Sequence, residues 1–125
     1  MAKILIVEDN LDLLAILREL LSVEHEVETA RRGEEAVLRA KEFEPDLVIL
    51  DLQLPSMDGI EAGRWIKKEL EPRRVAILAL TALAQAGDPE AILASGCCDA
   101  YMAKPASLED IRSAVESLLR VGERT

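Results

Sequence analysis

Long apolar runs are missing from this sequence of 125 residues. None approaches the roughly 18 to 20 residues that a membrane-spanning helix needs. The N-terminal part also lacks a basic start followed by an apolar run and a small-residue cleavage site, which together mark a secretory signal. We therefore expect a soluble, unexported protein that works in the cytoplasm without a membrane partner.

Cysteine is scarce, and the two cysteines, Cys97 and Cys98, are adjacent. That spacing builds no disulfide framework and does not match a metal-ligand motif. It fits a reducing compartment, so we expect both side chains to be small packing residues.

The 15 Lys and Arg residues are outnumbered by 24 Asp and Glu residues, which gives a net charge of -9. Contacts to nucleic-acid phosphates need clustered Lys and Arg, whereas the sequence offers only short pairs such as 31–32 and 73–74. We expect no direct binding to nucleic acid.

The length and the 50% hydrophobic content allow one core and are too small for two ordinary domains. The sequence shows no repeats, low-complexity tracts or linkers. We therefore expect a single domain over residues 1–125.

Short apolar runs predict five strands, at residues 3–7, 27–30, 47–50, 76–80 and 100–103. Continuous hydrophobicity is typical of strands that are buried on both faces of a parallel sheet. The intervening segments have helical spacing, at residues 11–22, 33–42, 59–70, within 84–95, and 108–120. Ser107 and Asp110 form a capping box before the last helix, and Asp88-Pro89 resembles a helix start. This alternation predicts a doubly wound α/β domain with a five-stranded parallel sheet and five helices.

Chemically capable side chains follow four of the predicted strands. Glu8 and Asp9 follow the first, Asp51 the third, Thr81 the fourth and Lys104 the fifth. In a parallel sheet these strand ends share one edge, where doubly wound domains bind their ligands. The sequence therefore predicts a site with three acids, a hydroxyl and an amine.

Clustered carboxylates need a cation, because two of them about 4 Å apart repel by several kcal/mol at an effective dielectric near 20. Mg2+ prefers oxygen ligands and is typically held by one or two carboxylates plus a substrate phosphate. Asp9 and Asp51 are candidate ligands, with Glu8 acting through water. Beside the metal, Asp51 could attack phosphorus as a nucleophile, while Lys104 and Thr81 contact the phosphoryl oxygens.

Four segments resemble the receiver domain of bacterial two-component response regulators, and the resemblance covers nearly the whole chain. They are ILIVEDN, LVILDLQLPSMDG, ALTA and GCCDAYMAKP. The resemblance implies a flavodoxin-like fold with strand order 2-1-3-4-5. It also implies the following roles: Glu8 and Asp9 as the acidic pair, Asp51 as phosphoacceptor, the backbone carbonyl of Gln53 as a further metal ligand, Thr81 and Lys104 as phosphoryl contacts, a cis peptide before Pro105, and Tyr101 as the aromatic switch that follows Thr81.

The resemblance further implies a phosphohistidine donor, either a histidine kinase or a histidine phosphotransfer protein. The protein target would bind the surface around the fourth helix, fifth strand and fifth helix. Mg2+ is the expected cofactor, with Mn2+ as the alternative, and the chain is expected to be a monomer or a phosphorylation-dependent dimer.

The first helix carries more leucine and isoleucine than one covered face requires, and Ile16 and Leu20 fall towards one margin. We expect that margin to dock the donor. Gln53 and Leu83, two residues after Asp51 and Thr81, are expected to tune phosphoryl hydrolysis. His25 is expected to be a solvated loop residue without a role.

Three other functions remain open at this point. A Mg2+ phosphohydrolase would share Asp51, Thr81, Lys104 and the metal, but Gln53 stands where a second acid is needed. A nucleotide-binding or flavodoxin-like module would bind a phosphate group, which Glu8 and Asp9 would repel. The sequence also lacks a G-x-G-x-x-G motif after the first strand. A receiver that is never phosphorylated would act as a constitutive adaptor.

Overall fold

The computed structural model describes residues 1–82 and 88–123. Over these residues, strands and helices alternate in the order β1 (Lys3–Val7), α1 (Leu11–Ser22), β2 (Glu26–Ala30), α2 (Gly33–Phe43), β3 (Leu47–Leu50), α3 (Gly59–Leu70), β4 (Ala76–Ala82), α5 (Pro89–Ala94), β5 (Ala100–Lys104) and α6 (Leu108–Glu123).

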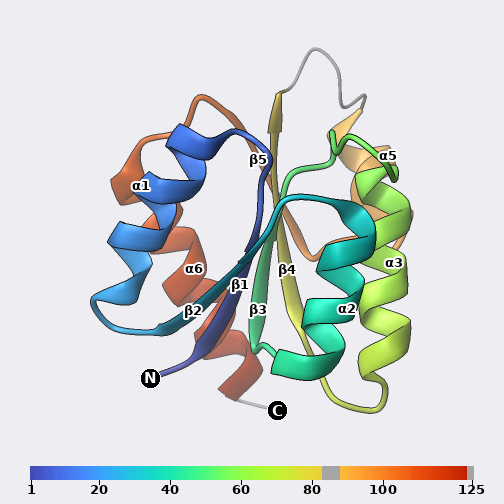
Figure 1. Ribbon diagram of the computed structural model, residues 1–125, viewed down its shortest axis with the longest axis horizontal. Coiled ribbons are helices and arrows are strands. Elements are labelled where there is room, and N and C mark those ends of the chain that lie inside the picture. The colour runs from blue at the N-terminus through green and yellow to red at the C-terminus, as the bar shows by residue number, and fades with distance from the viewer. Residues whose placement is uncertain (83–87, 124–125) are drawn as a thin grey trace.

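The strands form one parallel sheet in the order β2-β1-β3-β4-β5, with β3 at its centre between β1 and β4 (Figure 1). Both the predicted fold class and the predicted strand order are confirmed. Because all strands run in the same direction, their carboxyl ends meet at one edge of the sheet.

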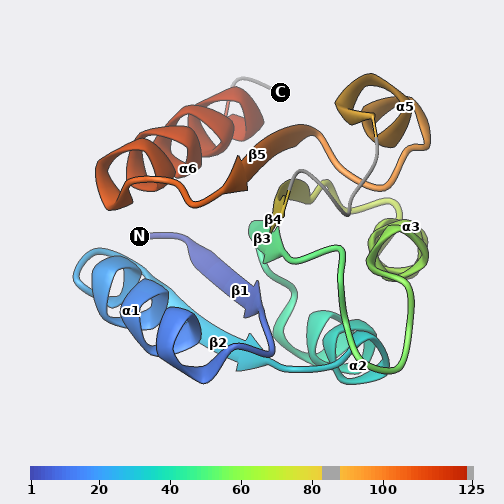
Figure 2. The ribbon, with the colours of Figure 1, turned by 90° about the horizontal axis from the view of Figure 1, so that it is seen from above.

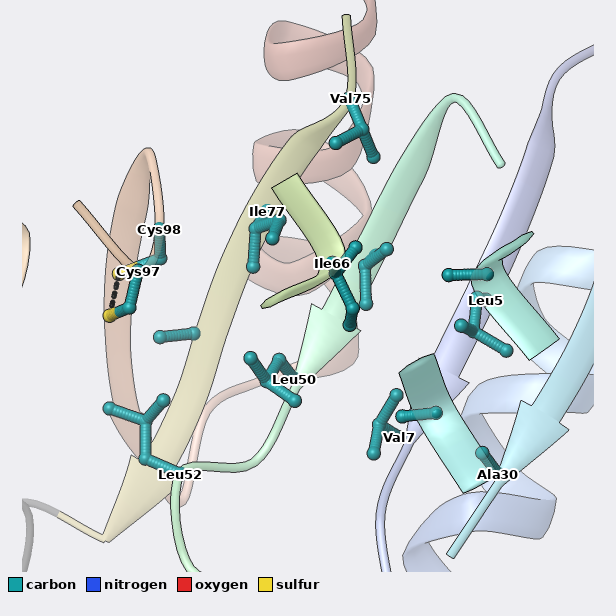
Figure 3. Close-up of a cluster of buried hydrophobic side chains, with 14 of the residues drawn as sticks. Leu5, Val7, Ala30, Leu50, Leu52, Ile66, Val75, Ile77, Cys97 and Cys98 are labelled. Atoms are coloured by element: carbon teal, nitrogen blue, oxygen red, sulfur yellow. Dashed lines mark hydrogen bonds between the residues drawn. The ribbon is translucent and has the colours of Figure 1, made fainter. Parts of the chain in front are cut away.

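Helices cover both faces of the sheet. α1 and α6 lie against one face, and α2, α3 and α5 lie against the other (Figure 2). Alternate residues of each central strand therefore enter two different cores. Leu5 and Leu50 pack below α2 and α3 (Figure 3), whereas Ile6 and Ile49 pack below α1 and α6. Burial on both faces explains why the central strands read as continuous apolar runs.

The predicted first and last residues of β1, α1, β3 and α3 agree with the structure. The bounds of the other elements differ from the predicted ones. β2 begins at Glu26 and is only partly buried, because it is an edge strand. β4 continues to Ala82 and β5 to Lys104, so Thr81 and Lys104 lie inside their strands instead of after them. Part of the predicted fourth helix, residues 84–87, lies outside the described residues.

Side chains cap several helices near the carboxyl edge of the sheet. Asn10 Oδ1 accepts from the Leu13 N–H at 3.1 Å, and Asp58 Oδ1 accepts from the Ile60 N–H at 3.0 Å. Asp88 caps α5, whose first residue is proline, as predicted. Each cap satisfies a backbone donor that has no partner within its own helix.

Within the described part of the chain, no helix combines the length and the apolar composition that crossing a membrane requires.

Candidate functional site

The register of the central strands places two acids side by side. Val7 pairs with Leu50, so the residues that follow them, Glu8 and Asp51, leave the sheet next to each other. The Asp51 N–H still donates to the Val7 carbonyl at 3.0 Å, which extends the ladder by one bond. Both acids are buried, with 3% of Glu8 and 5% of Asp51 exposed.

Lys104 connects these two carboxylates. Its Nζ donates to Glu8 Oε1 at 2.6 Å and to Asp51 Oδ2 at 2.9 Å. The lysine reaches the acids from the last residue of β5, at the same edge of the sheet. Two buried negative charges therefore share one cation, which leaves the group one positive charge short of neutrality.

The second oxygen of each carboxylate accepts a backbone N–H. Glu8 Oε2 accepts from Asn10 at 3.0 Å, and Asp51 Oδ1 accepts from Gln53 at 2.9 Å. In both cases the donor lies two residues further along the chain, in the loop that leaves the strand. These bonds hold the loop backbone close to the acids and fix the carboxylate planes.

Burial raises the pKa of the Glu8 carboxyl above its ordinary value of 4.5, and the nearby charge of Asp51 adds to the rise. Hydrogen bonds from Lys104 and the Asn10 backbone act in the opposite direction without cancelling it. For Lys104, burial acts to lower the pKa, but hydrogen bonds to Glu8 and Asp51 raise the Lys104 pKa overall. The site therefore disfavours an uncompensated carboxylate and favours added positive charge.

The exposed Asp9 completes the acidic group. Carboxylate oxygens of Glu8, Asp9 and Asp51 all lie within 4.8 Å of one another. The three carboxylates offer the hard oxygen ligands that Mg2+ prefers, and the exposed position of Asp9 leaves room for the waters that this ion retains. The residues present thus fit a divalent cation.

Two buried hydroxyl groups belong to β4 and β5, the two strands that follow β3 in the sheet. Thr81, which is fully buried, and Tyr101 each have a side-chain oxygen without a hydrogen-bond partner among residues 1–82 and 88–123. A buried hydroxyl without a partner costs about 1–3 kcal/mol. The Thr81 hydroxyl is therefore available to a ligand oxygen, and Tyr101 packs against the core under α3 and α5.

Three further predicted residues take the following places. The peptide bond between Lys104 and Pro105 is cis. The Gln53 side chain is exposed. Leu83 lies outside the described residues, so its part in hydrolysis stays a prediction.

Ile16 and Leu20 line a groove of about 370 Å³ between α1 and α6, together with Leu108 and Arg112. Ile16 is 46% exposed, whereas Leu20 is half-buried against the core. The structure thus leaves apolar surface on the margin of α1 that the sequence indicated.

The expectation that His25 is solvated is wrong. Its side chain is 9% exposed, and its Nε2 lies 3.0 Å from Glu116 Oε1 on α6. The Ala2 N–H donates to Nδ1 at 3.1 Å, so in this arrangement Nε2 carries the proton and donates to Glu116. Local sequence gives no sign of this contact, because its partners are 91 residues apart.

Cys97 and Cys98 are buried, as expected of packing residues, with their Sγ atoms 3.4 Å apart (Figure 3). Burial raises the pKa of the Cys98 thiol to about 12. This thiol is therefore protonated at neutral pH.

Asn10 and Gly59 help to shape the site, a part that was not predicted for them from the sequence. Asn10 both caps α1 and donates its N–H to Glu8. Gly59 begins α3, where the sequence predicts a helix over residues 59–70, and a Cβ there would overlap the backbone of Leu52, the residue after Asp51. The signals were present in the sequence as a polar residue before α1 and a glycine after Asp58.

Comparisons with known proteins agree on one family. The sequence model described as "Response regulator receiver domain" matches residues 4–116. The polar-differentiation response regulator DivK of Brucella ovis is 38% identical over 117 residues, which cover 93% of this chain and 94% of the relative.

Two solved structures are similar along almost the whole chain. The receiver domain of sensor histidine kinase PA1611 from Pseudomonas aeruginosa PAO1, with a magnesium ion coordinated in its active-site cleft, is 34% identical with a TM-score of 0.82 and covers 94% of this chain and 97% of that one. A CheY-like receiver domain protein from Methanospirillum hungatei JF-1 is 26% identical with a TM-score of 0.90 and covers 99% and 98%.

Proposed function

Because the chain belongs to the response regulator receiver domain family, we propose that it is a phosphoacceptor switch in which Asp51 takes a phosphoryl group from a phosphohistidine. Receiver domains act in two-component signalling, where the phosphoacceptor role is general, and they interact with histidine kinases, phosphotransfer proteins and effector domains. The assignment of the individual roles to residues of this chain is our proposal.

The observation that carries this proposal is the shared bond of Lys104 to the buried Glu8 and Asp51. A lysine held against the nucleophile is already placed to pair with a phosphoryl group attached there. When an Asp51 oxygen attacks phosphorus, the bond from phosphorus to the donor histidine nitrogen breaks, and that nitrogen keeps the electron pair.

Mg2+ is the proposed cofactor, with Mn2+ as the alternative. Glu8, Asp9, Asp51 and the backbone carbonyl of Gln53 would hold it, and its charge would neutralise the transferring oxygens. Receiver domains bind Mg2+ in their active site, as the PA1611 receiver illustrates. Lys104 donates to two of the carboxylates that would hold the ion, so its positive charge would oppose the charge of the ion there.

Thr81 and Tyr101 are the proposed relay. The Thr81 hydroxyl, which has no hydrogen-bond partner among residues 1–82 and 88–123, would donate to a phosphoryl oxygen on Asp51 and gain a charge-assisted hydrogen bond. In the sheet, Tyr101 is paired with Ala79, two residues before Thr81. A shift at the end of β4 would therefore reach the aromatic ring and the surface of α5, β5 and α6, where the protein target is proposed to bind.

Donor docking is proposed at Ile16 and Leu20, in the groove between α1 and α6. Gln53 and Leu83 remain the proposed tuning positions for hydrolysis. A cytoplasmic location and a monomer or phosphorylation-dependent dimer complete the proposal, since the proposed donors present phosphohistidine inside the cell.

Incubation with acetyl phosphate and Mg2+, followed by intact-mass measurement, tests this function. The wild type is expected to gain one phosphoryl group, and Asp51→Asn none. Asp12→Asn, which changes an exposed carboxylate at the start of α1, is the control and is expected to label as the wild type does. Equal labelling of Asp51→Asn would contradict the proposal, and steady turnover of simple phosphate esters would favour a phosphohydrolase instead.

A further inference from the structure

The loop between β3 and α3 rests against the start of α2. Gly33, the first residue of α2, is buried beneath Met57 of this loop. A Cβ at Gly33 would lie 2.5 Å from Met57 Cβ, 3.0 Å from Cγ and 3.1 Å from Sδ. The loop therefore comes closer to α2 than any residue with a side chain at position 33 would allow.

A hydrogen bond lies next to this contact. Ser56 Oγ donates to Glu34 Oε1 at 2.8 Å, so consecutive residues of the loop meet consecutive residues of α2. Both partners are exposed, and solvent competes for such a bond. The packing of Met57 on Gly33 is therefore the stronger of the two connections.

Two hydrogen bonds fix the ends of the same loop, next to Asp51. The Gly59 N–H donates to the Leu52 carbonyl at 3.0 Å, and the Gln53 N–H donates to Asp51 Oδ1 at 2.9 Å. Hydrogen bonds hold the two ends of the loop together, and Met57 rests on α2. The loop therefore has little freedom to shift independently of α2. Any displacement of Met57 must therefore be absorbed within a few residues of Gln53.

We propose that Gly33 is a positioning residue for the metal site, because its missing side chain lets Met57 seat the 52–58 loop and thereby sets the place of the Gln53 backbone. This inference rests on the proposed function, in which the Gln53 carbonyl is a Mg2+ ligand. Gly33 touches neither the ion nor the phosphoryl group and acts through Met57.

Gly33→Ala separates this role from helix stability. Alanine favours a helix over glycine, and the backbone at position 33 is not in the left-handed region, so α2 itself is not expected to suffer. The added methyl group must instead push Met57 and its loop away. Mg2+ binding requires near-ideal octahedral geometry and should weaken by about tenfold.

A double-mutant cycle tests whether the effect passes through Met57. Mg2+ affinity is measured by calorimetric titration of the full chain for wild type, Gly33→Ala, Met57→Gly and the double variant. Because Met57→Gly removes the three atoms nearest to the new methyl group, Gly33→Ala is expected to change the affinity less than about twofold in that background. Glu35→Ala is the control, since Glu35 accepts from the Arg31 N–H in the same turn of α2, and it is expected to bind Mg2+ as the wild type does.

Thermal unfolding by circular dichroism accompanies each titration. Unchanged Mg2+ affinity in Gly33→Ala, with or without a lower unfolding midpoint, would overturn the inference, as would an equal loss in both Met57 backgrounds. If Gly33→Ala does not fold, Met57→Ala offers a second test, because it removes the Met57 side chain beyond Cβ without creating a clash. Wild-type Mg2+ affinity in Met57→Ala would also overturn the inference. A wild type that binds no Mg2+ would overturn the proposed function itself.

Discussion

Lys104 Nζ lies 2.9 Å from Asp51 Oδ2, so the cation proposed to hold the phosphoryl group is already bound to the proposed nucleophile. The same ammonium lies 2.6 Å from Glu8 Oε1. Lys104 thus neutralises part of the charge that a divalent cation would neutralise at this site, so we expect the two cations to compete.

Lys104→Met should therefore tighten Mg2+ binding while it impairs phosphorylation. Removing the ammonium leaves Glu8 and Asp51 without their cation, so we expect the Mg2+ dissociation constant to fall by roughly tenfold, about 1.4 kcal/mol. Titration calorimetry measures this constant, and intact mass after acetyl phosphate measures labelling. Lys67→Met is the control, because Lys67 pairs with Asp99 on another part of the fold. Weaker Mg2+ binding in Lys104→Met would contradict the competition.

Thr81→Val should stabilise the unphosphorylated protein. Valine has nearly the shape of threonine and removes a buried hydroxyl that has no partner among the described residues, so we expect a gain of about 1 kcal/mol in the free energy of unfolding. Urea unfolding without Mg2+ or phosphodonor measures this gain. The half-buried Thr29 on β2 supplies the control Thr29→Val. A loss of stability of similar size in Thr81→Val would show that the hydroxyl already has a partner.

The stability of the wild type should depend on Glu8 in a defined pH window. The folded-state pKa of Glu8 lies above its ordinary value of 4.5, so the folded protein binds this proton more tightly than the unfolded chain does. The corresponding stability is fully present below pH 4.5 and is lost as the pH rises through the folded-state pKa. Glu8→Gln avoids that loss.

In urea unfolding without Mg2+, we therefore expect Glu8→Gln to be more stable than the wild type at pH 7. The difference should shrink as the pH falls to about 4.5 and below. Glu26→Gln changes an exposed carboxylate and should follow the wild type at both pH values. A Glu8→Gln variant that is less stable than the wild type at pH 7 would mean that its bond with Lys104 outweighs burial.

Ile16→Glu should separate protein donors from small-molecule donors. The side chain is 46% exposed and lines the groove between α1 and α6, whose described lining residues do not include Glu8, Asp9 or Asp51. We expect slower transfer from a histidine phosphotransfer protein and unchanged labelling by acetyl phosphate. Leu38→Glu is a matched control, because Leu38 is 58% exposed on α2, across the sheet. Equal slowing with both donors would contradict docking at this margin.

The parts of the fold that could be predicted from the sequence are those in which local pattern and burial coincide. β1 and β3 are buried on both faces, so their bounds appear directly as apolar runs. β2 lies at an edge and carries Glu26 and Glu28, so its start was placed one residue too late. The convergence of Glu8, Asp51 and Lys104 could be predicted because a parallel sheet brings like strand ends together.

Contacts between distant segments could not be predicted in this way. His25 meets Glu116, and Gly33 lies beneath Met57, through the packing of helices whose rotation and tilt no local pattern specifies. Likewise, the number of hydrogen bonds that Thr81 makes depends on the surroundings of its hydroxyl in three dimensions. The sequence indicated which residues gather at the edge of the sheet, but not which of their atoms have hydrogen-bond partners within the described part of the chain.

Direct location of the phosphoryl group tests the central claim. After labelling with acetyl phosphate and Mg2+, borohydride reduction converts an aspartyl phosphate to homoserine, and peptide mass spectrometry identifies the altered position. We predict homoserine at position 51 and unmodified aspartate at position 9. Homoserine at another acid, or a phosphoryl group that resists borohydride and maps to His25, would contradict it.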